Sequence, residues 1–177
     1  INNASEEDVI RVMQLSERPH WGPSDSNATE NPNLRLEAYI DAARRGAAVR
    51  ILLDRYFDDP ENPLSNSATC HYVREVATTE DLDMACELGN PAGLGIHNKM
   101  ILVTNRMEHF AIIGSVNGTE LSQKGNREIA LEINSVELHE FLAAMFDQDW
   151  PKSIYLPMIF NDYLGPANHL LISEVLY

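Results

Sequence analysis

Three polar clusters lie at the ends of short apolar runs between residues 96 and 132. Short apolar runs of this kind are more typical of strands than of helices. If the strands pair in one sheet, the clusters bring together an imidazole, an ammonium group, a hydroxyl, an amide and a carboxylate. Such a set can bind a phosphate and attack it. The clusters are His97-Asn98-Lys99, Gly114-Ser115-Val116-Asn117 and Asn126-Arg127-Glu128.

The chemistry that suits these groups is cleavage of a phosphodiester without a metal ion. That reaction needs a nucleophile, donors for the non-bridging oxygens and an acid for the leaving group. His97 is the candidate nucleophile, because a neutral imidazole attacks well near pH 7. Lys99, two residues further along an extended strand, points to the same side, and its positive charge suits phosphate.

The second and third clusters supply the remaining groups. Ser115 and Asn117 are also two residues apart and can donate to phosphate oxygens, while Gly114 allows a close approach of the backbone. We expect Glu128 to hold one ring nitrogen of His97. This contact would fix the tautomer and stabilise the imidazolium, as the acid of a catalytic triad does.

The order His97-x-Lys99, Gly114-Ser115-x-Asn117 and Asn126-x-Glu128 resembles the HKD signature of the phospholipase D superfamily. The flanking segments 49–54 and 146–150 resemble the same family, so the likeness covers roughly residues 8–151. The resemblance implies a phosphodiester hydrolase without a cofactor, in which His97 forms a phosphohistidine. It also implies that Lys99 and Asn117 hold the phosphate and that Glu128 orients His97.

Two features depart from the family pattern. The motif continues as K-x4-D, but Thr104 occupies the position of the aspartate, which is mainly structural in the family. A complete site also needs two HKD copies, one histidine attacking and the other acting as general acid, and this chain carries one copy. The resemblance therefore implies a second half from a homodimer mate or from an upstream domain.

The function class has alternatives. A phospholipid headgroup and a nucleic-acid backbone present the same diester, so a phospholipase D-like nuclease is one alternative. Another is a catalytically silent phospholipase D-like scaffold or binding domain of a secreted multidomain protein, which Thr104 keeps open. A chance combination of a surface histidine and a Gly-Ser turn is the third.

The composition favours a small diester over a polyanion. The chain has 13 Lys and Arg against 27 Asp and Glu, a net charge of −14, which disfavours a broad nucleic-acid platform. A phospholipid headgroup is therefore the preferred substrate. No apolar run approaches the length of a membrane span. The Cys and His residues do not have the spacing of a zinc site, so we expect no metal. Cys70 and Cys86 are either one disulfide of an exported protein or two buried thiols.

The elements that position the clusters form an α/β fold of the phospholipase D type. We expect a mixed, mostly parallel β-sheet flanked by helices on both faces, with the site at one end of the strands. The first strand, helix and second strand are predicted at 8–15, 33–45 and 48–53. A long loop at 16–32 carries His20 and Trp21, which we expect to anchor it.

The second half of the predicted fold is less regular. A helix at 65–77 begins at Ser65 or Ser67, and 78–95 gives no clear prediction. A last helix begins at Asn134 as N-cap and buries Val136, Leu138, Phe141, Leu142, Met145 and Phe146 before it ends near Trp150.

We predict a phospholipase D-like domain at 1–151 and a C-terminal extension or linker at 152–177. The end of the extension, 169–177, reads as a strand and resembles the first strand of a lamin-tail-like domain. That likeness implies a longer, secreted or extracellular parent protein, with a cytoplasmic location as the alternative. The absence of an initial Met and of a signal pattern favours an excised piece.

Overall fold

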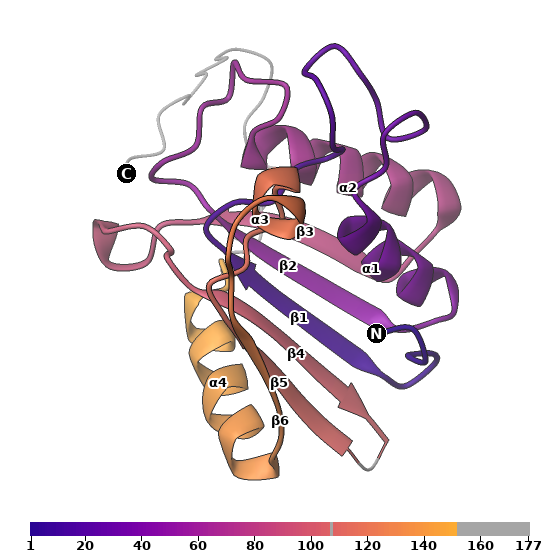
Figure 1. Cartoon of the computed structure of the whole chain (residues 1–177). Coiled ribbons are helices and arrows are strands. Elements are labelled where there is room, and N and C mark those ends of the chain that lie inside the picture. The colour runs from indigo at the N-terminus through magenta and orange to yellow at the C-terminus, as the bar shows by residue number, and fades with distance from the viewer. Residues whose placement is uncertain (107, 152–177) are drawn as a thin grey trace, which may run out of the picture.

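A computed structural model describes residues 1–106 and 108–151, which form a six-stranded mixed sheet with helices on both faces (Figure 1). The α/β class expected from the sequence is confirmed. The predicted extension at 152–177 lies outside the described residues. The strands are β1 (Val9–Gln14), β2 (Ala48–Asp54), β3 (Met84–Gly89), β4 (Lys99–Asn105), β5 (Glu108–Gly114) and β6 (Ala130–Asn134). The helices are α1 (Leu34–Arg44), α2 (Asn66–Glu80), α3 (Glu120–Lys124) and α4 (Val136–Asp149), with a short 3-10 turn at Pro91–Gly93.

The sheet has the strand order β3-β2-β1-β4-β5-β6. The first half is parallel, because α1 and α2 carry the chain back between β1, β2 and β3. The second half is antiparallel, from the β1–β4 pair through β4–β5 to β5–β6. The expected mostly parallel sheet is thus corrected to a mixed one with more antiparallel pairs, since the short β4–β5 connection forms a hairpin.

Two apolar cores lie on opposite faces of the sheet. Helices α1 and α2 cover one face over β1, β2 and β3, while α4 lies on the other face against β1, β4 and β5 (Figure 1). The larger core includes Tyr39, Ile51 and Val103, and the smaller one is centred on Leu102 and Phe146. The short helix α3 lies by the end of the sheet where β1 stops, because Gly118, just before it, pairs with Glu17 after β1.

The helix starts follow side-chain caps. Asn33 is the N-cap of α1, because its side-chain oxygen accepts from the N–H groups of Arg35 and Leu36. Ser65, one of the two predicted caps, begins α2. The structure places a longer α2 and strand β3 in the region at 78–95 that the sequence left unassigned. Strand β3 pairs only with β2, so it is an edge strand with mixed polarity.

The last helix differs in two details from its prediction. Ser135, not Asn134, is the N-cap of α4, because Asn134 is the final residue of β6. Phe141 and Val136, expected inside, are exposed, while His139 is buried. The covered face consists of Leu138, Leu142, Met145 and Phe146, which leaves Phe141 at its rim.

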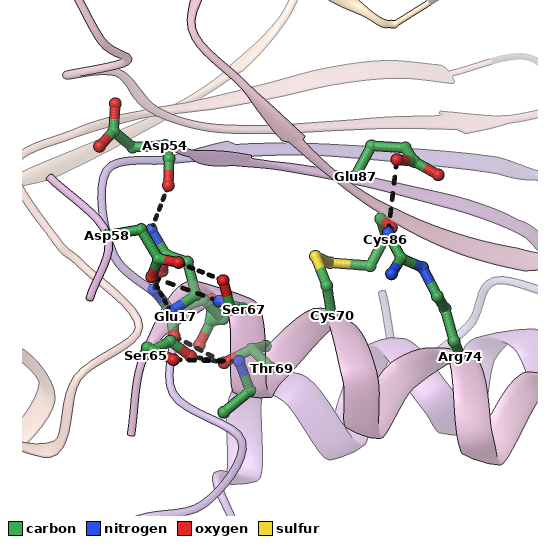
Figure 2. Close-up of a disulfide and its surroundings, with 12 residues drawn as sticks. Glu17, Asp54, Asp58, Ser65, Ser67, Thr69, Cys70, Arg74, Cys86 and Glu87 are labelled. Atoms are coloured by element: carbon green, nitrogen blue, oxygen red, sulfur yellow. Dashed lines mark hydrogen bonds and ion pairs between the residues drawn. A yellow bond between two sulfur atoms is a disulfide. The ribbon is translucent and has the colours of Figure 1, made fainter. Parts of the chain in front are cut away.

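The two cysteines form a disulfide that joins α2 to β3 (Figure 2). Cys70 and Cys86 are both buried and separated by 16 residues in sequence. Of the two possibilities left open by the sequence, the structure therefore has the bonded form. The bond fixes the helix against the edge strand of the sheet.

Candidate active site

His97 and Lys99 lie together at the start of β4. The Nζ atom of Lys99 is 3.3 Å from Nδ1 of His97 and donates to the carbonyl oxygen of His97 over 2.7 Å. An ammonium group can only donate, so Nδ1 of His97 is the acceptor in this arrangement. The His97 side chain is exposed and that of Lys99 is half-buried, so both can reach a bound phosphate.

The segment that carries His97 is held by Asp54 at the carboxyl end of β2. This fully buried carboxylate accepts from the N–H of Ile96 over 2.5 Å and from the N–H of Phe57 over 2.7 Å. Asp54 thus ties the loops after β2 and before β4 to one point next to His97. From the sequence, Asp54 could be assigned only to the segment 49–54 that flanks the motif.

Ser115 and Glu128 form the second part of the site. The hydroxyl of Ser115 donates to one oxygen of the Glu128 carboxylate. The other oxygen accepts from Ser122 over 2.6 Å and from Asn126 over 3.2 Å. No hydrogen bond joins Glu128 to His97 in the described part of the chain. The carboxylate instead holds the loop between β5 and β6.

Gly114 and Asn117 occupy positions that their types explain. A Cβ on Gly114 would lie 2.7 Å from the Cα of Ala130 and still closer to the carbonyl of Ile129, so only glycine permits this strand contact. The backbone of Asn117 is held by Ser122 and Gln123 of α3, over 3.0 and 2.9 Å. Its own side-chain Oδ1 is buried and has no partner among the described residues.

The charges of the site reinforce each other. Hydrogen bonds from Ser115, Ser122 and Asn126, with the nearby charge of Lys99, lower the pKa of Glu128 below its ordinary value. Burial lowers the pKa of Lys99, and the charge of Glu128 opposes that shift. Glu128 is therefore a carboxylate at neutral pH, and the site pairs one fixed anion with one cation available for a phosphate.

Gln14 is a neighbour that the motifs did not reveal. It lies directly opposite Lys99 in the β1–β4 pair, it is 1% exposed, and its Oε1 has no partner among the described residues. A cavity of about 30 Å³, lined also by Arg35 and Gly114, adjoins it. Its signal in the sequence is a polar residue at the end of an apolar strand, which alone does not identify a site.

A larger cavity of about 440 Å³ opens beside His97. Its walls include the exposed ring of Phe57 and the charged groups Arg18, Asp58 and Asp59. Asp58 caps α2 by accepting from Asn66 and Ser67, so its charge is partly committed. Within residues 1–106 and 108–151, no three His, Cys, Asp or Glu side chains are grouped to hold a metal ion.

Comparison with known proteins gives one family. Residues 1–150 match the family profile described as "Cardiolipin synthase, PLD-like domain". The chain belongs to the phospholipase D-like family. A search of curated protein sequences gives no match.

Two solved structures share the phospholipase D-like fold. Nuc from Salmonella typhimurium, described as a phospholipase D family member, superposes with a TM-score of 0.61 at 22% identity. NucT from Helicobacter pylori superposes with a TM-score of 0.59 at 14% identity. Each comparison covers 84% of this chain and 80% of the other. At these identities, the likeness supports the fold.

The departure from the phospholipase D-like motif at Thr104 lies far from His97. Thr104 is the sixth residue of β4, so roughly 16 Å of extended strand separates it from Lys99. Its hydroxyl lies 3.2 Å from Nε2 of His139 on α4. Thr104 therefore joins the strand to a helix and does not touch the site.

The loop residues His20 and Trp21 act as anchors, as expected. Both are buried, and the indole N–H of Trp21 points to the carbonyl of Gly118 at 3.4 Å. Trp21 thus packs behind the Ser115–Asn117 cluster and does not line the mouth. In the part of the chain that the structure describes, no helix has the length and apolar composition to cross a membrane.

Proposed function

We propose that the chain is the catalytic half of a metal-independent phosphodiesterase acting through a phosphohistidine. A nitrogen of His97 attacks phosphorus, and the P–O bond to the leaving alcohol breaks. Lys99, Ser115 and Asn117 hold the non-bridging oxygens. A histidine of a second HKD half protonates the leaving oxygen. Attack by water then breaks the P–N bond and regenerates His97, while attack by another alcohol gives transfer.

The observation that supports this proposal is the meeting of three separate segments at one sheet end. Lys99 lies against His97, and Ser115 lies against Glu128, whose charge also acts on Lys99. Four of the five predicted side chains therefore form one electrostatic unit. Asn117 is proposed to complete it through Nδ2, which can donate to a phosphate oxygen and takes part in none of the hydrogen bonds of Asn117 among the described residues.

The proposed role of Glu128 requires a movement of His97. In the present arrangement Nδ1 of His97 accepts from Lys99, whereas a triad-like role needs Nδ1–H to donate to the carboxylate. Because the imidazole is exposed, a rotamer change costs little packing. We propose that phosphate binding draws Lys99 away from His97 and allows this change.

The second HKD half is proposed to come from a homodimer mate or an upstream domain. Three apolar side chains near the site are exposed, as expected if another chain or domain covers this edge of the sheet. Leu121, Ile129 and Leu131 are 66%, 69% and 55% exposed. We propose that the second HKD half covers these side chains, which would form one apolar patch. The concentration dependence of activity distinguishes the two sources.

For the substrate, we propose a phospholipid headgroup or another small diester over nucleic acid. The net charge of −14 and the carboxylates of Asp58 and Asp59 beside His97 repel an extended polyanion. Nucleic-acid cleavage, the alternative, would weaken steeply with rising salt, because phosphate contacts release counterions. A nearly flat salt dependence with a small diester supports the preferred substrate.

We also propose an exported location. Disulfides persist in oxidising compartments, and the Cys70–Cys86 bond supports such a setting. Thiol titration of protein from the native source, trapped with an alkylating reagent before lysis, tests this. Two free thiols would contradict it.

The test of the function is hydrolysis of bis-p-nitrophenyl phosphate in the presence of EDTA over a range of protein concentrations. Activity that rises faster than linearly indicates a homodimer. Silence at all concentrations, relieved by adding the upstream half of the parent protein, indicates an upstream partner. Silence in both cases contradicts the proposed enzyme and favours the scaffold alternative.

A further inference from the structure

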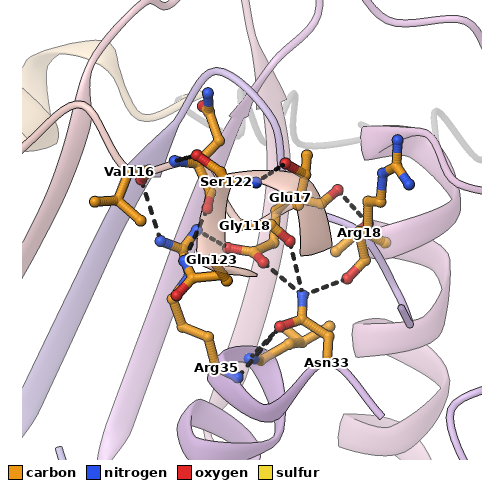
Figure 3. Close-up of polar contacts among 12 residues, drawn as sticks. Glu17, Arg18, Asn33, Arg35, Val116, Gly118, Ser122 and Gln123 are labelled. Atoms are coloured by element: carbon orange, nitrogen blue, oxygen red, sulfur yellow. Dashed lines mark hydrogen bonds and ion pairs between the residues drawn. The ribbon is translucent and has the colours of Figure 1, made fainter. Parts of the chain in front are cut away.

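The backbone of residues 116–118 is held from the side of α1 by two residues outside the HKD motif. Arg35 donates through Nη1 to the carbonyl of Val116 over 3.3 Å. Asn33 donates through Nδ2 to the carbonyl of Gly118 over 3.1 Å (Figure 3). These contacts hold the backbone before and after Asn117, the predicted phosphate ligand.

Glu17 is the centre of this cluster. Its carboxylate is fully buried, with one oxygen 2.5 Å from Nη2 of Arg35 and the other 2.7 Å from Nδ2 of Asn33 (Figure 3). Burial alone would lower the pKa of Arg35, but Tyr39 and then Glu17 raise it above its ordinary value. A buried ion pair of this kind adds little stability on balance, because both charges lose their hydration.

Glu17 also lies directly against the backbone of the site loop. A Cβ at Gly118 would overlap its carboxylate, so the glycine is required for this approach. The N–H of Gly118 donates to the carbonyl of Ser16 over 2.8 Å, beside the Glu17–Gly118 bridge. The end of β1 and the loop after β5 are thus held together.

We propose that Glu17 and Arg35 are positioning residues, which fix the backbone of residues 116–118 so that Asn117 faces the phosphate before substrate binds. The inference rests on the proposed function of the Ser115–Asn117 cluster. Because the peptide groups are held by α1 and α3, the side chain of Asn117 is not needed to hold the loop. The hydrogen bonds of Asn117 among the described residues use its backbone N–H and C=O and leave Nδ2 available to donate to a phosphate oxygen.

The first experiment measures amide hydrogen exchange by NMR in the whole chain. Glu17→Gln keeps the side-chain shape but places an amide against Arg35. The proposal expects exchange at the Asn117 and Gly118 amides to rise at least tenfold more than at β1 and β2 amides. Ile10→Val, a core substitution far from the loop, is the destabilised control and raises exchange evenly. An even rise in Glu17→Gln overturns the proposal.

The second experiment separates positioning from stability. Arg35→Met leaves Glu17 buried without its partner and lowers the melting temperature. The double variant Glu17→Gln with Arg35→Met has no buried charge, so its melting temperature recovers. The contact to Val116 remains absent, and kcat for bis-p-nitrophenyl phosphate stays about tenfold to a hundredfold below wild type. Recovery of kcat together with the melting temperature overturns the proposal.

The two levels of the argument fail differently. A wild-type chain that is inactive with every partner half contradicts the proposed function, and the exchange experiment still decides whether Glu17 holds the loop. An active wild type whose kcat does not change in Glu17→Gln contradicts the positioning role alone. Ile10→Val keeps wild-type kcat below its melting temperature in either case.

Discussion

The two ends of β4 each have a histidine nearby, in opposite settings. At the site end, His97 is exposed, accepts from Lys99 and lines the cavity of about 440 Å³. Near the far end, His139 is 4% exposed, lies 3.2 Å from Thr104 and packs edge-on against His109 at 5.0 Å between ring centroids. The comparison shows that the exposure of the side chain, and not the residue type, distinguishes a candidate nucleophile from a packing residue.

The sharpest contrast comes from replacing each histidine. His97→Asn should reduce turnover at least about a thousandfold and leave the melting temperature unchanged, because the ring is exposed and would be the nucleophile. His139→Asn should keep turnover within about twofold and lower the melting temperature. Steady-state kinetics and thermal denaturation measure both. Equal loss of turnover in the two variants would erase the contrast.

Lys99 extends the contrast to cations. Lys99→Met should lower kcat/KM by roughly a hundredfold, because the substrate phosphate loses the ammonium group that pairs with it in a partly buried site. The matched control is Lys124→Met, which removes an exposed ammonium that pairs with Glu120 on α3. If both variants lose the same activity, the effect is one of general charge and the assigned role of Lys99 is wrong.

The disulfide tests whether global stability and the site are separable. Replacing Cys70 and Cys86 by Ala should lower the free energy of unfolding by about 3 kcal/mol, since the bond closes a loop between residues 16 apart. Turnover below the melting temperature should stay unchanged, because the bond joins α2 to β3 away from His97. Denaturant unfolding and kinetics measure the two quantities, and a parallel loss of both would link them.

Glu128→Gln should lower kcat about tenfold, because an amide keeps part of the hydrogen bonding but loses the charge that would stabilise the imidazolium. Glu132→Gln, on the exposed edge strand β6, is the control. The dependence of kcat on pH should keep its wild-type shape at alkaline pH in the Glu132→Gln control. No change of kcat in Glu128→Gln would leave the carboxylate a purely structural role.

The smallest expected effect is the pH dependence of the melting temperature, to which His139 near the far end of β4 contributes. Burial, then His109 and Arg11, lower the pKa of His139, so the folded state favours the neutral ring. The unfolded chain binds the proton more readily, and this contribution to stability is lost as pH falls below about 6.5. The melting temperature should therefore decrease between about pH 7.5 and about pH 5.5. His139→Gln should flatten that decrease, and an unchanged pH slope would contradict the assignment.

The sequence was informative where function depends on short, ordered motifs. Strand pairing places Lys99 against His97 and Ser115 against Glu128, because each of these residues stands within two residues of a strand end. The predicted hydrogen bond between Glu128 and His97 is not among those of the described residues. Such a bond depends on side-chain rotamers, which strand register does not determine.

Other features depend on contacts between distant segments. Glu17 pairs with Arg35 and presses against Gly118, three places that no local pattern connects. Strand β3 was missed because an edge strand needs no continuous apolar run. Phe141 was placed inside because the helical period defines a face but not how far the sheet beneath it extends.

The central claim is a covalent phosphohistidine at His97. The most direct measurement is intact-mass spectrometry of protein quenched in alkali during turnover of bis-p-nitrophenyl phosphate with EDTA, using the active assembly. The account predicts a mass increase of one p-nitrophenylphosphoryl group, because only one of the two ester bonds has broken, located at His97 by fragmentation and absent in His97→Asn. Turnover without an adduct, or an adduct on another residue that survives in His97→Asn, would contradict it.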